Sequence, residues 1–122
     1  MSLTHLQVVS IPVSDQDRAM AFYRDVLGFE LIADLSMGTD QRWVHLGPKD
    51  AQTSITLVTW FETMPPGSLK GLVVSTNSLD ADHAALTRKG LKLTSIESAP
   101  WGRYATFDDP DGNGWVLQAA AA

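Results

Sequence analysis

The stretch of sequence that decides the fold reads IPVSDQDRA over residues 11–19 and FYRDVLGF over residues 22–29. Residues 6–13 are rich in β-branched side chains, which predicts a strand that closes at Pro12. Ser14 or Asp15 can then cap a helix, and Gly28 suits the left-handed residue that ends one. Between them, apolar residues recur at helical spacing: Ala19, Phe22, Tyr23, Val26 and Leu27. The pattern therefore predicts a strand followed by one amphipathic helix.

The remaining sequence predicts eight more short elements, separated by Gly and Pro turns. Three strands complete the first half: residues 29–35, 42–46 and 54–61. After the PPG run at 65–67, the second half repeats the order with a strand, a helix and three strands: 71–75, 79–89, 91–96, 104–107 and 115–118. The helix caps and the helix-ending glycines of the two halves align when one half is placed over the other, as Ser14 with Asn77 and Gly28 with Gly90. We interpret the chain as a duplicated β-α-β-β-β module, the alternative being two unrelated α+β segments with chance similarity.

The composition excludes several classes of protein. The chain has 122 residues and contains no cysteine, so it has no disulfide, zinc ribbon, iron–sulfur cluster or thiol nucleophile. Nine basic and fourteen acidic residues leave a formal charge of −5, which argues against nucleic acid as a partner. No apolar run is long enough for a membrane span, and the first residues do not resemble a signal peptide. We expect a single cytoplasmic domain over residues 1–122, with modules at 5–61 and 69–119 and no membrane partner.

A second motif near the end of the chain reads FDDPDGNGW over residues 107–115. Together with residues 11–29 it resembles the opening and closing segments of the glyoxalase/bleomycin-resistance/dioxygenase superfamily, also called vicinal oxygen chelate proteins. The resemblance implies an α+β fold in which two βαβββ modules form curved mixed sheets around a cavity, with the helices outside. Members of this family commonly pair their modules in dimers, and open sheet edges favour pairing, so we expect a homodimer.

In the metal-dependent members of this family, His or Glu side chains on the first and last strands of each module hold a divalent ion. The matching positions in this sequence are Val8, Thr56 (or its neighbour Leu57), Gly71 and Val116. These side chains cannot replace the imidazole or carboxylate ligands that such a site needs. The sequence therefore predicts no metal and no cofactor, and it names no catalytic residue.

Strand alternation separates a helix-covered face from a cavity face in each sheet. The helix-covered face is expected to be uniformly apolar, with Val9, Ile11, Ile55, Leu57, Leu72, Val74, Trp115 and Leu117. The cavity face is expected to be mixed and partly polar, with Leu6, Ser10, Ser54, Val58, Trp60, Val73, Ser75 and Gln118. A mixed lining of this kind is typical of a ligand pocket.

Aromatic side chains are the strongest indication of a ligand. Large flat rings with polar tips suit planar guests, and an acidic protein suits a cationic one. We therefore predict a metal-free site for a planar, neutral or cationic molecule, in which His45 and Gln118 supply hydrogen bonds. The predicted ligand-binding residues are Trp43, His45, Trp60, Trp101, Tyr104 and Gln118. Trp101 and Tyr104 lie near a turn, where the alternation rule does not apply, and are expected to rim the opening of the site.

Three classes of function remain open at this stage. The first is a metal-free small-molecule binding protein that resembles the antibiotic-sequestering branch of the superfamily. The second is a glyoxalase-like lyase or isomerase, or an extradiol dioxygenase, with an atypical metal site; only kinship of fold supports it. The third is a structural or regulatory protein with no small-molecule site.

Overall fold

The computed structural model describes residues 1–38 and 41–120 and contains two β-α-β-β-β modules, each built on one four-stranded mixed sheet. The first module consists of β1 (Val8–Pro12), α1 (Gln16–Ala21), the π-helical turn η1 (Phe22–Val26), β2 (Glu30–Ser36), β3 (Arg42–Gly47) and β4 (Ser54–Val58). The second consists of β5 (Leu72–Thr76), α2 (Leu79–Arg88), β6 (Glu97–Ala99), β7 (Gly102–Asp108) and β8 (Gly114–Ala119). The predicted fold class is confirmed.

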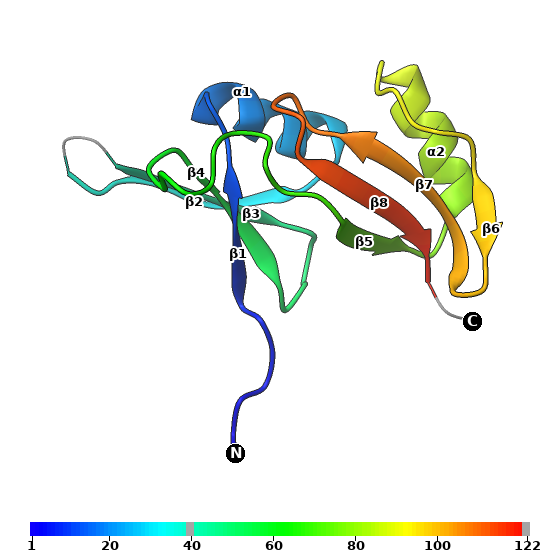
Figure 1. Ribbon diagram of the computed structural model, residues 1–122, viewed down its shortest axis with the longest axis horizontal. Helices are drawn as coiled ribbons and strands as arrows, with labels where there is room; N and C mark the ends of the chain where they lie inside the picture. The colour runs from blue at the N-terminus through cyan, green and yellow to red at the C-terminus, as the bar shows by residue number, and fades with distance from the viewer. Residues whose placement is uncertain (39–40, 121–122) are drawn as a thin grey trace.

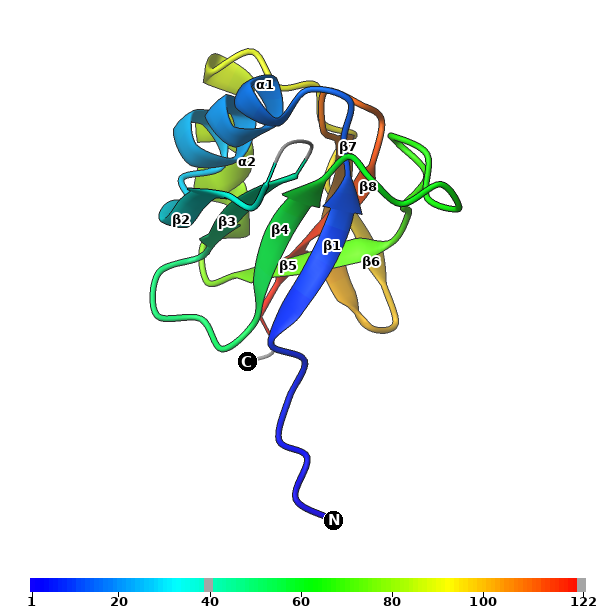
Figure 2. The same ribbon diagram turned by 90° about the vertical axis from the view of Figure 1, so that its left-hand side faces the viewer.

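The two sheets have the same topology. Their strand orders are β1-β4-β3-β2 and β5-β8-β7-β6, and in each the first strand runs parallel to the last one of its module. Ser10 lies opposite Thr56 in the first sheet, and Val73 lies opposite Val116 in the second. Figure 1 shows the sheets side by side along the long axis of the molecule, and Figure 2 shows both helices gathered at the same side.

The first helix begins at Asp15, whose carboxylate accepts a hydrogen bond of 3.1 Å from the backbone N–H of Arg18. Its second half is the π-helical turn η1, after which Gly28 adopts a φ of +76°. The backbone N–H of Phe29 donates to the carbonyl of Tyr23 at 2.9 Å, and both aromatic side chains are buried. The end of the helix therefore places the rings of Tyr23 and Phe29 in the core.

The predicted strand over residues 91–96 is wrong. This segment forms no ladder, and the short strand β6 begins only at Glu97. The N–H of Thr94 donates to the carbonyl of Thr106, but the N–H of Thr106 donates to the side-chain oxygen of Thr94 at 2.8 Å instead of to a backbone carbonyl. The alternating Leu91 and Leu93 pack against the core without a regular ladder, so apolar alternation alone misled the prediction.

One hydrophobic core joins the two modules, and the helix-covered faces of both sheets line it. Ile11 and Leu57 come from the first sheet, and Trp115 and Leu117 from the second, as the alternation predicted. Tyr23 provides a link, since its ring centroid lies 5.8 Å from that of Trp115. Because the helix-covered faces share one core, the two helix-free faces lie on its outer sides and not opposite one another.

Candidate functional site

The helix-free face of the first sheet carries a row of three side chains across three strands. Thr56 on β4 lies opposite Ser10 on β1 and opposite His45 on β3. Trp43 follows on the same face of β3, and its ring centroid lies 5.6 Å from that of His45 at an interplanar angle of 65°. We call this group the first half-site.

His45 is held in place by a neighbouring hydroxyl. Its Nε2 lies 2.5 Å from Oγ of Ser54, and that hydroxyl in turn donates to the carbonyl of Gln7 at 3.2 Å. A serine hydroxyl has one proton, so while it donates to the carbonyl its oxygen accepts from a protonated Nε2 of His45. In this arrangement the Nδ1 atom of a neutral His45 is an acceptor.

Thr56 stands out by an unsatisfied hydroxyl. Its side chain is 2% exposed, and its Oγ1 has no hydrogen-bond partner among the residues that the structure describes. Leaving a buried hydroxyl unpaired costs about 1–3 kcal/mol. The hydroxyl of Thr56 therefore does not stabilise the fold through a hydrogen bond.

An ion-pair network fixes the strand that carries Trp43. The guanidinium of Arg42 donates to both carboxylate oxygens of Asp34 at 2.8 Å, and to Asp17 at 2.8 Å. These hydrogen bonds lower the pKa of the Asp34 carboxyl. Because the network links β3 to β2 and to α1, it limits how far the first half-site can shift relative to the helix.

The helix-free face of the second sheet carries a second aromatic group, which we call the second half-site. The rings of Trp101 and Tyr104 lie 4.5 Å apart at an angle of 35°. Gln118 lies opposite Tyr104 in the ladder, and its Nε2 donates to the carbonyl of Trp101 at 3.2 Å. Ser75 lies opposite Gln118 on β5 and is exposed. The Tyr104 hydroxyl approaches Glu97 at 3.4 Å, so a carboxylate adjoins this face.

The structure thus brings the predicted site residues together in two groups and not in one. Trp43 and His45 are neighbours, and Trp101, Tyr104 and Gln118 are neighbours, but no hydrogen bond or aromatic contact joins the groups within residues 1–38 and 41–120. Trp60 lies beyond the end of β4, where alternation no longer applies. It is half-buried, 6.1 Å from the ring of Phe61.

Two exposed apolar residues extend the half-sites beyond the residues predicted to bind a ligand. Leu35 on β2 lies opposite Trp43 and is 59% exposed, and Val73 on β5 is 57% exposed. Alternation predicted Val73 on the helix-free face of the second sheet. The pairing of β2 with β3 was needed to place Leu35 beside Trp43. Both half-sites therefore present more apolar surface than the tryptophans alone indicated.

The residues present do not fit a divalent metal ion. On the helix-free faces the central positions are Ser10, Thr56, Val73 and Val116, which offer two neutral hydroxyls and no imidazole or carboxylate. In the part of the chain that the structure covers, no three His, Cys, Asp or Glu side chains lie close enough to share an ion.

None of the helices within residues 1–38 and 41–120 is long and apolar enough to cross a membrane.

Two β-α-β-β-β modules that share one core, each built on a four-stranded mixed sheet, define a protein with the glyoxalase-like fold. The chain belongs to the glyoxalase/bleomycin resistance protein/dioxygenase superfamily, whose family model matches residues 3–117.

The chain is also similar to individual proteins, two of them with solved structures. The chain is 47% identical to TnmS3, an antibiotic binding protein from Streptomyces sp. CB03234, with a TM-score of 0.94 and 99% of each chain covered. A glyoxalase/bleomycin resistance protein from the same organism is also 47% identical, with a TM-score of 0.85, 93% of this chain and 99% of that one. The uncharacterized protein YetH of Bacillus subtilis (strain 168) is 28% identical over 120 residues, which is 95% of this chain and 98% of that protein.

Proposed function

We propose that this protein binds a planar organic molecule of the antibiotic class, neutral or cationic, and holds it without a metal ion. The observation that carries the proposal is the pair of aromatic half-sites on helix-free faces whose central positions are hydroxyl and aliphatic. The similarity to an antibiotic-binding protein supports the same class of ligand.

The chemistry of the half-sites matches such a guest. Trp43 and Trp101 offer flat apolar surfaces, and stacking on an aromatic ring is worth about 0.5–1.5 kcal/mol beyond the area buried. His45 and Gln118 provide hydrogen bonds that orient the guest in its plane. Glu97 beside Tyr104 and the formal charge of −5 favour a cation over an anion.

The binding unit in this proposal is a homodimer. Each chain carries both half-sites on outer sides of its core, so a closed pocket needs the first half-site of one chain against the second half-site of its partner. The apolar side chains that such pairing would cover are exposed in the single chain: Ile32 (56%), Leu35 (59%), Val73 (57%) and Trp101 (56%). Exposed apolar groups on two faces mark protein interfaces or ligand grooves.

Tryptophan fluorescence tests this function. Bleomycin and a panel of polycyclic aromatic antibiotics are titrated into the chelator-treated protein, and at least one is expected to bind with saturation. Trp43→Ala and Trp101→Ala should each weaken that binding several-fold while the circular dichroism spectrum stays unchanged. Lys92→Ala, a change on the exposed segment after α2, is the matched control and should bind as the wild type does. Saturable binding that appears only after a divalent ion is added would contradict the proposal.

A further inference from the structure

A separate pocket lies at the seam between the two modules, on the helix side of the molecule. Its volume is about 310 Å³, which is enough for a small organic molecule. None of the six predicted ligand-binding residues lines it. We call it the seam pocket.

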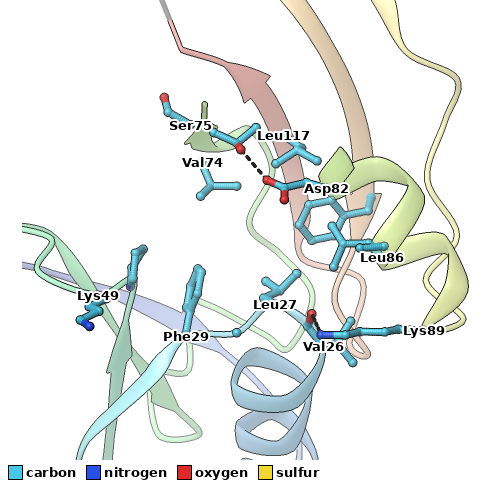
Figure 3. Close-up of a pocket in the computed structure, with 15 residues that line it drawn as sticks. Val26, Leu27, Phe29, Lys49, Val74, Ser75, Asp82, Leu86, Lys89 and Leu117 are labelled. Carbon is cyan, nitrogen blue, oxygen red and sulfur yellow. Dashed lines mark hydrogen bonds between the residues drawn. The ribbon is translucent and has the colours of Figure 1, made fainter. Parts of the chain in front are cut away.

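The walls of the seam pocket combine apolar and polar side chains and come from both modules. Figure 3 shows Leu27 and Phe29 of the first module on one side, and Val74, Leu86 and Leu117 of the second module on the other. Phe29 and Leu117 belong to the buried core. A guest in this space would therefore contact the two modules at once.

Two oppositely charged side chains border the seam pocket: Asp82 on α2, and Lys89 directly after the end of α2. The carboxylate of Asp82 points into it, and one of its oxygens accepts a hydrogen bond from the Thr76 hydroxyl (Figure 3). Lys89 reaches across to the end of η1, where its Nζ donates to the carbonyls of Asp25 and Val26 at 3.1 Å each. An ammonium group has three N–H donors, so one remains after these two bonds.

Asp82 and Lys89 do not neutralise one another. No ion pair joins them in the described part of the chain, although both line the same pocket. The second carboxylate oxygen of Asp82 therefore can accept from a guest, and the remaining N–H of Lys89 can donate to it. Charged groups beside apolar walls form stronger hydrogen bonds with a guest than they do in open water.

We propose that the seam pocket is a second ligand site, and that it takes a small zwitterion with an apolar side group, such as a free hydrophobic α-amino acid. The ammonium group of the guest pairs with Asp82, its carboxylate pairs with Lys89, and its side chain lies between Leu27, Phe29 and Leu117. A simple amine or a simple carboxylate satisfies only one of the two charges and leaves the other facing an apolar group. Lys49 also lines the pocket and is exposed.

Isothermal titration calorimetry and ¹H–¹⁵N NMR with L-leucine and L-phenylalanine test this proposal on the full chain. We expect one saturable site per chain, with shifts confined to the residues that line the seam pocket and their neighbours in the chain. Glycine, isoamylamine and 4-methylvalerate are the comparison compounds, and each should bind at least about tenfold more weakly, because each lacks one of the three matched groups.

Two variants and one control keep the test decisive. Asp82→Asn and Lys89→Met should each weaken leucine binding by about tenfold or more, while Trp101→Ala on the outer face should leave it unchanged. Asparagine still accepts from Thr76, so Asp82→Asn is expected to fold. Absence of saturable binding at 20 mM amino acid (about a hundredfold above a ~0.2 mM dissociation constant) would overturn the proposal. So would equal binding of isoamylamine or 4-methylvalerate, or unchanged binding in both variants.

Discussion

The phenolic hydroxyl of Tyr23 donates a 2.7 Å hydrogen bond to Oδ2 of Asp109, which joins the first helix to the turn before β8 across the core. The same hydroxyl accepts from the indole Nε1–H of Trp115 at 3.0 Å, and Asn113 donates to Asp109 at 2.8 Å and to the carbonyl of Pro12 at 2.9 Å. The network is buried and connects residues of both modules. It therefore determines how the two modules sit against each other.

Tyr23→Phe should destabilise the protein strongly for so small a change. It removes a hydrogen bond to a carboxylate and leaves the indole N–H of Trp115 without an acceptor, which predicts a loss of about 2–4 kcal/mol in the free energy of unfolding. Urea denaturation measures it. Tyr104→Phe, whose hydroxyl is exposed and only 3.4 Å from Glu97, is the matched control and should lie within about 0.5 kcal/mol of the wild type. Equal stability of both variants would show that the network does not hold the modules together.

The same tyrosine should make the protein sensitive to alkali. Burial, and then the nearby carboxylate of Asp109, raise the pKa of Tyr23 far above its ordinary value. In the unfolded chain this phenol loses its proton near pH 10, whereas in the folded protein it keeps it. The unfolded state thus binds fewer protons above pH 10, so the free energy of unfolding falls as the pH rises beyond that value. We expect a steeper fall from pH 9 to 11 for the wild type than for Tyr23→Phe, measured by urea denaturation at each pH.

Thr56→Val should stabilise the fold or leave it unchanged. The variant removes a buried hydroxyl that has no partner and keeps a β-branched side chain of similar shape on β4, so a gain of about 1 kcal/mol is expected. Ser54→Ala is the contrast, because its hydroxyl is bonded to His45 and to the carbonyl of Gln7 and its loss should cost stability. Thermal unfolding of both variants measures the difference. A Thr56→Val protein that is less stable than Ser54→Ala would mean that the Thr56 hydroxyl has a partner.

The proposed dimer makes a prediction about mass. Light scattering at micromolar concentration should give twice the chain mass of 13.3 kDa. Val73→Glu places a charge on the helix-free face of β5, where a partner would bury it, and should shift the mass towards one chain. Arg88→Gln at the exposed end of α2 lowers the net charge by the same one unit and is the control. A single-chain mass for the wild type would contradict the dimer and leave the two half-sites separate.

Elemental analysis separates the binding proposal from the enzymatic alternatives. We expect less than about 0.1 equivalent of Zn, Ni, Fe or Mn per chain after purification without chelator, because the central positions of the helix-free faces offer two hydroxyls and His45 adds one imidazole, where such a site needs about three strong donors. Stoichiometric metal would favour a lyase, isomerase or dioxygenase with relocated ligands.

The sequence by itself determined which way the strand residues face. Alternation put Ile11, Leu57 and Leu117 towards the helices, and the structure buries all three in the core. The first strand and helix of each module were also predictable, because caps and apolar spacing act within about a dozen residues. These signals are local. The alternation of side chains along a strand is enough to determine which face of the strand each residue occupies.

Only the tertiary structure decided how the elements stand relative to one another. Periodicity states which side of its own strand a residue occupies, and does not state which distant element covers that side. For this reason the bond between Tyr23 and Asp109, the unpaired hydroxyl of Thr56 and the separation of the aromatic residues into two half-sites all escaped the sequence argument. Each depends on contacts between residues far apart in the chain, which form only when the two modules close on one core.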